Sequence, residues 1–295
     1  MARKLNLKKH LNSKTLGQLF FIAVVTLPVL SGLVYATLYS LGFVGVLNKG
    51  FTTENWEAIF FGSPFWTSIL FSFYVAVTSI VLSLVFSLSM ALSWKKALQK
   101  GALSTAMYLP LCFPGTVMAF FMFQLLSKSG FLSRLGFTAG ILSELNQFPA
   151  LINDAYGIGI IITSVVLITP FFVILFSNMY RSENIANYKQ LASTFGATKL
   201  QLLTKVTLPI LLKKSSVTIY LFVIFVMGSY EIPLLLGRQS PQMISVAILQ
   251  KIQRFNLYDI PKGFAMSILY VLIIISVLLL LYFRNRDFFK TETNA

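Results

Sequence analysis

The chain has 295 residues, of which 56% are hydrophobic and 11% are charged, and its mean hydropathy is +0.78. Polar side chains are too few to cover a soluble globule of this size, so the composition excludes a soluble protein and predicts a membrane protein. A net charge of +15 would also fit nucleic-acid binding, but the basic residues stand beside apolar segments, where anionic lipid headgroups attract them. We therefore expect membrane lipids as partners and no nucleic acid.

Six apolar segments are long enough to cross a hydrocarbon core, which takes about 20 helical residues. We expect an all-α membrane protein with six transmembrane helices, at residues 19–44, 66–93, 103–126, 157–179, 215–236 and 264–283. The first segment is longer than the apolar core of a signal peptide, about 7 to 15 residues, and is interpreted as a retained span. Residues 19–284 then form one six-span domain, with a basic tail at 1–18 and a second tail at 285–295.

The distribution of Lys and Arg predicts the orientation, because cytoplasmic flanks of membrane proteins retain basic residues. With the N-terminus inside, 17 of the 24 basic residues fall on the inner side and 7 on the outer side. Both termini are therefore expected in the cytoplasm. The segment between the fourth and fifth spans, residues 180–214, becomes the longest inner loop.

Two outer segments are expected to hold short helices. Residues 51–61 predict an interfacial helix, in which Thr53 can act as the N-cap and Trp56 lies at headgroup depth. Residues 127–156 mix apolar and polar side chains with three glycines and are expected to form short helices over the outer mouth.

Prolines interrupt two of the predicted spans. Pro110 and Pro114 lie in the third span and Pro170 in the fourth, and each removes a backbone donor and favours a kink. A distorted helix in lipid needs neighbours for the freed carbonyl groups, so these spans are expected to face protein or a water-filled path. Prolines that only shape helix packing are the alternative interpretation.

The inner loop, residues 180–214, predicts two short helices around a bend. The first helix, residues 185–195, places apolar side chains at helical spacing on one face: Tyr188, Leu191, Ala192 and Phe195. Gly196 provides the backbone freedom that ends this helix, and Thr198 can cap the next one. Pro209 suits the first turn of the helix that becomes the fifth span.

The spacing in this loop resembles the EAA loop of the membrane-spanning subunits of binding-protein-dependent ABC importers. That pattern is Glu-Ala-Ala, three residues, Gly, nine residues and Ile-x-Leu-Pro. In this chain the matching positions hold Gln190, Leu191 and Ala192, then Gly196, and finally Val206, Leu208 and Pro209. The chain departs from the pattern at Gln190, which replaces the acid, and at Leu191, which replaces an alanine.

The resemblance implies a multi-pass permease subunit in a bacterial inner membrane, with cytoplasmic coupling helices between spans four and five. Its implied partners are two ATP-binding subunits, a second permease subunit that is a copy or a different chain, and an extracytoplasmic solute-binding protein. The loop docks on an ATP-binding subunit in that family. By the resemblance, the docking residues are Gln190, Leu191, Ala192, Phe195, Gly196, Ala197 and Pro209. ATP and magnesium are expected on the partner ATPase, and no cofactor on this chain, which has no phosphate-binding loop.

Glu231 is the one ionisable side chain within a predicted span. A carboxylate there costs a few kcal/mol unless it faces water or a partner, so it predicts a functional site. Gly228 and Pro233 flank it, which is typical of a distorted helix beside a path, and with Tyr230 they form a candidate translocation path. The alternative is a carboxylate at headgroup level that only fixes the helix position. The segment also resembles the fifth span of importers for polyamines, ferric iron, thiamine and oxyanions, which favours a small charged solute.

Other functional classes find little support in the sequence. The single cysteine, Cys112, and the single histidine, His10, leave no Ser-His-Asp, Cys-His or metal-ligand set, so neither an enzyme nor a metal site is expected. A secondary transporter or channel driven by an ion gradient is the alternative function, but it usually needs several ionisable groups within the membrane. A membrane-embedded enzyme or scaffold would need polar side chains clustered at one depth, and the sequence has none.

Overall fold

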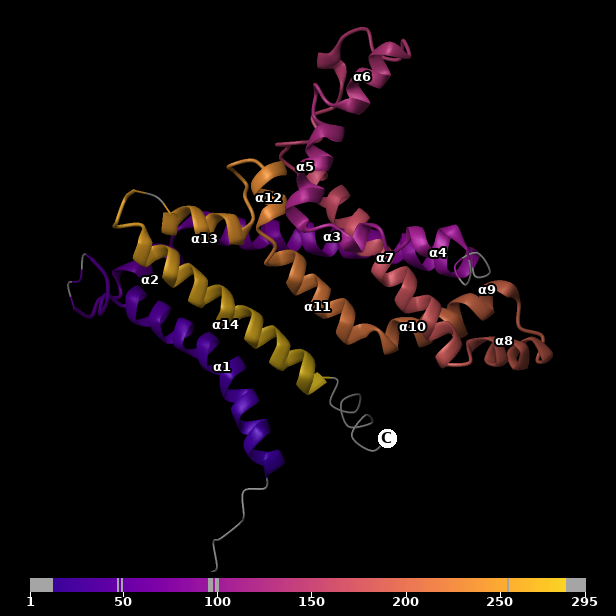
Figure 1. The fold of residues 1–295 in the computed structure, drawn as a ribbon, viewed down its shortest axis with the longest axis horizontal. Coiled ribbons are helices and arrows are strands. Elements are labelled where there is room, and N and C mark those ends of the chain that lie inside the picture. The colour runs from indigo at the N-terminus through magenta and orange to yellow at the C-terminus, as the bar shows by residue number, and fades with distance from the viewer. Residues whose placement is uncertain are drawn as a thin grey trace, which may run out of the picture. The chain divides into compact units, whose positions relative to one another are not determined.

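The computed structural model describes residues 13–46, 48, 50–94, 98, 101–253 and 255–284. Within these ranges every regular element is a helix (Figure 1), as the composition predicted. The chain divides into two compact units, one formed by residues 1–62 and 248–295 and the other by residues 63–247. The predicted C-terminal tail, His10 and most of the N-terminal tail lie outside the described residues, and the predicted domain boundaries stay predictions.

The first unit contains two long helices, α1 (Ser13–Ser40) and α14 (Ile260–Arg284), which pack against each other. Both coincide with predicted spans. The described part of α1 is exposed along most of its length and is buried near its C-terminal end, at Ala36, Tyr39 and Ser40. Such an apolar, exposed helix suits lipid or another subunit rather than water.

The short helix α2 (Glu54–Phe60) confirms the helix predicted in the outer segment 51–61. It is tied to the end of α1, because Trp56 Nε1 donates to Ser40 Oγ at 3.2 Å and Asn55 Nδ2 donates to the Ser40 carbonyl at 3.1 Å. Thr53 occupies the N-cap of this helix, as predicted, but its side chain makes no capping hydrogen bond. Thr53 has helical rather than extended backbone angles, and its hydroxyl donates to Glu57 Oε1 at 2.9 Å instead of accepting a backbone bond.

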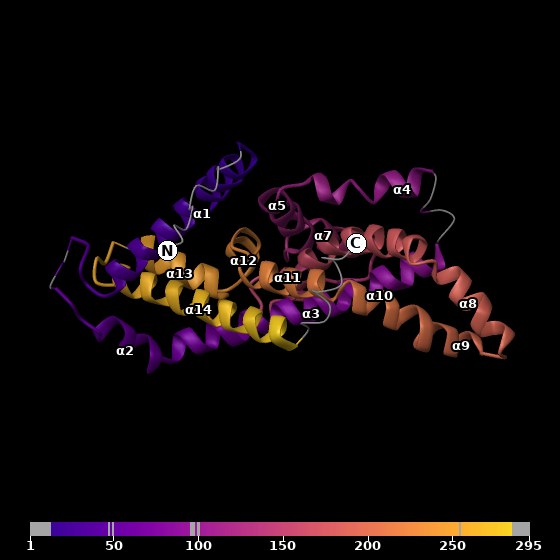
Figure 2. The same cartoon turned by 90° about the horizontal axis from the view of Figure 1, so that it is seen from below.

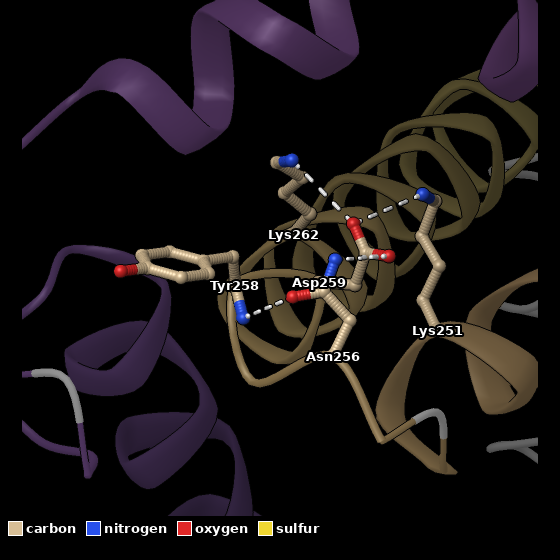
Figure 3. A network of polar contacts seen from close by, with 5 residues as sticks. All are labelled: Lys251, Asn256, Tyr258, Asp259 and Lys262. Atoms are coloured by element: carbon tan, nitrogen blue, oxygen red, sulfur yellow. Dashed lines mark hydrogen bonds and ion pairs between the residues drawn. The ribbon is translucent and has the colours of Figure 1, made fainter.

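A polar network fixes the turn that leads into α14. Figure 3 shows Asp259 between two lysines, with Oδ1 at 3.4 Å from Lys262 Nζ and 3.9 Å from Lys251 Nζ. Asn256 closes the turn, since its Oδ1 accepts from the Tyr258 N–H at 3.2 Å and its Nδ2 lies 3.4 Å from Asp259 Oδ2. These partly exposed contacts hold the turn in one conformation, although each contributes little stability alone.

The second unit is built on a pair of long helices, α3 (Ser63–Ser93) and α7 (Ile158–Ser182), which pack along each other. Both match predicted spans, and α7 continues through Pro170. Small buried side chains line the inner face of α3 and let a neighbouring backbone approach closely: Ser68, Ser72, Ser79, Ser83 and Ser87. From α7, Phe172 and Phe176 fill the opposite side of the core.

The third predicted span is not one continuous helix. It is divided into α4 (Ala102–Ala106), the 3-10 turn η1 (Pro110–Cys112) and α5 (Gly115–Leu126). The breaks fall at the two prolines, whose missing N–H groups cannot join the helical ladder. Beyond α5, the predicted outer segment does hold short helices, α6 (Phe131–Thr138) and η2 (Leu145–Gln147). The apolar candidate span, however, covers Gly115–Thr138 and not residues 103–126, so it includes α6.

The fifth predicted span is also interrupted. Helix α11 (Ser216–Met227) stops at Gly228, and α12 (Glu231–Leu236) begins three residues later. α13 (Ile244–Gln253) follows. The described residues hold five helices long and apolar enough to cross a membrane, or six if α11 and the helix bent against it count as one span.

Candidate functional site

The inner loop folds into a compact helical group beside the end of α7. It consists of α8 (Ile185–Thr194), α9 (Lys199–Gln201), a π-helical turn η3 (Leu202–Thr207) and α10 (Leu208–Lys214). Figures 1 and 2 both place α8, α9 and α10 together at one end of this unit. The side chains of Ile185 and Leu211 are fully buried, and α8 packs on both α7 and η3. The loop is therefore a supported structure rather than a free linker.

The bend at Gly196 has the geometry that the sequence predicts. Gly196 has φ +78°, its N–H donates to the Ser193 carbonyl at 3.0 Å, and the Ala197 N–H donates to the Ala192 carbonyl at 3.2 Å. This pair of bonds is the Schellman ending of a helix, which favours glycine because of the left-handed backbone. A Cβ at this position would meet no atom within 4 Å, so backbone strain and not space selects glycine.

Thr198 caps the helix after the bend, as predicted, and it does so with a partner that the sequence analysis missed. Thr198 Oγ1 accepts from the Gln201 N–H at 3.3 Å, while Gln201 Oε1 accepts from the Thr198 N–H at 2.8 Å. The reciprocal pair is a capping box. Its signal was present as Thr-x-x-Gln after the glycine.

The apolar face predicted on the first loop helix is exposed. The exposed fractions are 55% for Tyr188, 58% for Leu191 and 83% for Phe195, and Leu200 on the following helix reaches 68%. The other predicted docking residues are exposed or half-buried: Gln190, Ala192, Gly196, Ala197 and Pro209. Large apolar side chains at this exposure form a surface suited to a partner.

The entry into α11 differs from the prediction. Pro209 does lie in the first turn of α10, but α10 ends at Lys214, and the helix over Lys199–Lys214 is bent by 58° against α11. The break falls at Ser215, whose Oγ donates to the Leu211 carbonyl at 2.7 Å. Pro209 has no N–H to offer the preceding turn, which accounts for the π-helical register just before it.

A second feature of this unit is a hollow where both interrupted spans meet. Its volume is about 500 Å³, and α7 supplies one wall. The remaining walls come from the break around Pro110–Gly115 and the break after α11. Tyr230 and Glu231 are among the lining residues, whereas the other two predicted path residues, Gly228 and Pro233, are not. Gly228 caps α11, and Pro233 is buried in α12.

Glu231 is accommodated by a glycine on the neighbouring segment. Its Oε2 lies 2.7 Å from the position that a Cβ on Gly115 would take. Because α5 begins at Gly115, the carboxylate stands near the N-terminal end of a helix, where the dipole favours negative charge. Ser229 Oγ is buried in the same hollow without a hydrogen-bond partner among the described residues. Sequence reasoning assigned Gly115 and Ser229 no role, because nothing local in the sequence brings them to Glu231.

Metal binding finds no support in the described part of the chain. Within it, no three His, Cys, Asp or Glu side chains come close enough to hold an ion, and the free thiol of Cys112 is exposed.

Comparison with known proteins identifies both the fold and the family. The model of the family described as "Binding-protein-dependent transport system inner membrane component" matches residues 83–289, more than half of the chain. No curated protein matches the chain in sequence.

Two solved structures share the fold. A chain of a bacterial ABC transporter that imports the acidic polysaccharide alginate superposes with a TM-score of 0.68 at 17% identity, covering 93% of this chain and 94% of the other. A chain of the bacterial alginate ABC transporter in complex with a periplasmic protein bound to alginate pentasaccharide gives a TM-score of 0.65 at 19% identity, covering 94% and 93%. With its family match, its interrupted apolar helices and its helical inner loop, this chain belongs to the inner-membrane components of binding-protein-dependent transport systems.

Proposed function

We propose that the inner loop docks on one of two partner ATPase subunits, which together drive this permease. The observation that supports this proposal most directly is the exposed apolar face of α8, formed by Tyr188, Leu191 and Phe195. The buried side chain of Ile185 anchors the same helix to the protein core. A rigid helix can transmit a displacement to the spans, whereas a flexible loop would absorb it. Gln190 in place of the family's acid leaves apolar contact as the main source of affinity.

The proposed transport path passes the hollow that holds Glu231. Two interrupted helices, a buried and unpaired Ser229 Oγ and one carboxylate meet there. Interrupted helices beside a cavity are the form in which membrane transporters commonly offer polar groups to a solute. A second permease subunit, either a copy of this chain or a different one, would complete the path, and an extracytoplasmic binding protein would deliver the solute.

We propose a small charged solute, of the polyamine, iron or thiamine kind, as the cargo. The support is the resemblance of the Gly228–Pro233 segment to such permeases and the single acid in the hollow. The structural neighbours import alginate, an acidic polysaccharide, so the two possibilities differ in size and charge. Purification of the accompanying binding protein, followed by titration with spermidine, ferric iron, thiamine and alginate oligosaccharides, decides between them.

Copurification tests the docking proposal. The tagged chain is expected to retain an ATP-binding subunit, and the double variant Leu191→Ala/Phe195→Ala is expected to lose it while still inserting in the membrane. Phe86→Ala serves as the control, because it removes a similarly exposed ring from α3, outside the loop. Normal ATPase retention by the double variant would refute the docking role and leave the family assignment intact.

A further inference from the structure

A cavity with several polar side chains in its lining lies at the junction between α7 and α8, next to the first turn of the docking helix and distinct from the Glu231 hollow. Its volume is about 260 Å³, several times the share of one water molecule, about 30 Å³. Ala91, at the end of α3, closes one side. The other walls are the last turn of α7 and the first turn of α8. Neither the family match nor the proposed path accounts for this cavity.

The lining groups are those that bind an anion. Arg181 is a permanent cation with several donors, and Asn184 and Asn187 carry amide groups. Ser177 also lines the cavity, and its Oγ is buried and has no hydrogen-bond partner among the described residues. A buried hydroxyl without a partner is costly, and an acceptor entering the cavity would satisfy it.

The N-terminal end of α8 also favours an anion. Asn184 occupies the N-cap of α8 with φ 47°, and its side chain makes no capping hydrogen bond. The Asn187 N–H already donates to the Asn184 carbonyl at 2.9 Å, whereas the N–H groups of Ile185 and Ala186, the first two of α8, have no acceptor within their own helix. Together with the helix dipole, they favour a negative group at this end of the ten-residue helix.

Nearby acids do not cancel this charge. Glu183 is the only acidic residue in the segment 180–214, and its Oε1 is 3.4 Å from Lys214 Nζ. No carboxylate is among the cavity's lining residues, whereas the guanidinium of Arg181 is, so the charge in the cavity favours an anion over a cation.

We infer that this cavity binds a phosphate group. Arginine matches the geometry of phosphate oxygens, and first-turn N–H groups bind them commonly. The source is either the headgroup of an anionic phospholipid, which the spans α3 and α7 would bring to this depth, or a soluble phosphate. Because the site joins the end of a span to the start of the docking helix, an occupied cavity would stiffen that joint. The inference concerns a separate site and holds whether or not α8 docks on an ATPase.

Binding to the purified full chain tests the inference. Phosphatidylglycerol retention is measured by native mass spectrometry and inorganic phosphate binding by phosphorus NMR, with phosphatidylcholine as the lipid comparison. The structure predicts binding of at least one of phosphatidylglycerol and phosphate. Arg181→Gln is expected to weaken it at least about tenfold, since one charge-assisted contact is lost. Arg181→Lys should retain part of it, and Lys213→Gln, an exposed lysine in the same loop that does not line the cavity, should change little.

Asn187→Leu supplies a second, charge-neutral variant, because it removes an amide and fills the cavity. Retention of phosphatidylglycerol alone would assign the site to lipid, and binding of phosphate alone to a soluble ligand, and both support the inference. Absence of both ligands, or binding that ignores Arg181→Gln and Asn187→Leu, overturns it. So does an Arg181→Gln variant that loses only its ATPase partner, because the cavity would then belong to a protein interface.

Discussion

Two glycines matter for different physical reasons. At Gly196 the space around the missing Cβ is open, and the left-handed φ of +78° sets the requirement. At Gly115 no left-handed angle is involved, and a Cβ would instead stand 2.7 Å from the Glu231 carboxylate. Substitution should therefore strain the backbone at the first position and displace a side chain at the second.

Gly196→Asp is expected to abolish ATP-driven uptake while leaving membrane insertion intact. The variant adds a charge beside the apolar docking face and strains the bend by about 1 kcal/mol, a strain that the isosteric asparagine shares. Gly196→Asn has a similar size, tolerates the left-handed conformation and carries no charge, so it should keep most of the activity. Uptake assays with immunoblots for membrane abundance make the comparison. Near-normal uptake by the aspartate variant would contradict the docking role.

Glu231→Ala is expected to reduce the transport rate with little change in abundance, because it removes the only acid in the hollow. Gly115→Ala should also change transport without unfolding, since the displaced atom is the end of a flexible side chain. In the Glu231→Ala background, Gly115→Ala should have no further effect. A double-mutant cycle on uptake rates measures this coupling, and strictly additive losses would show that the two residues act separately.

At the scale of elements, the capping box between Thr198 and Gln201 holds the start of α9 against the bend. Thr198→Ala should destabilise this helical start by about 1 kcal/mol. Hydrogen exchange of residues 199–214 would then be faster, and ATPase coupling weaker, than in the parent chain. Thr198→Ser keeps the oxygen and should behave like the parent. Unchanged exchange in the alanine variant would mean that the packing of Leu202 and Leu211 alone holds the segment.

The elements of the loop were more predictable than those of the spans. Gly196, Thr198 and the apolar period in residues 185–195 act over a few neighbours, so the bend and both helices follow from local chemistry. The interruption of the third span also has a local cause, the prolines at positions 110 and 114. A hydropathy average does not detect it, because the apolar residues on both sides fall within one window. The break after α11 falls at Gly228, where the flanking glycine and proline predicted a distorted helix, although hydropathy treated residues 215–236 as one span.

For the molecule as a whole, the positive-inside distribution predicts both termini and the loop 180–214 in the cytoplasm. Cysteine labelling checks this in a Cys112→Ser background, which removes the only native thiol. Lys128→Cys is expected to react with a membrane-impermeant maleimide in spheroplasts, and Lys205→Cys only after permeabilisation. Both positions are exposed, so access to the reagent differs only by side. Labelling of Lys205→Cys in intact spheroplasts would reverse the topology and remove the loop from the ATPase side.

The sequence by itself determined that the chain is a helical membrane protein, where most of its apolar segments lie, and that the segment 180–214 bends at Gly196. These properties depend on the free energy of transferring apolar side chains from water to lipid and on backbone preferences over a few residues. Both can be judged from the composition and the spacing of residues. Only the tertiary structure brought Gly115 to Glu231 and Ala91 of α3 to the junction between α7 and α8. These residues are far apart in the sequence and come into contact only when the interrupted helices pack against each other. A local sequence pattern carries no information about such contacts.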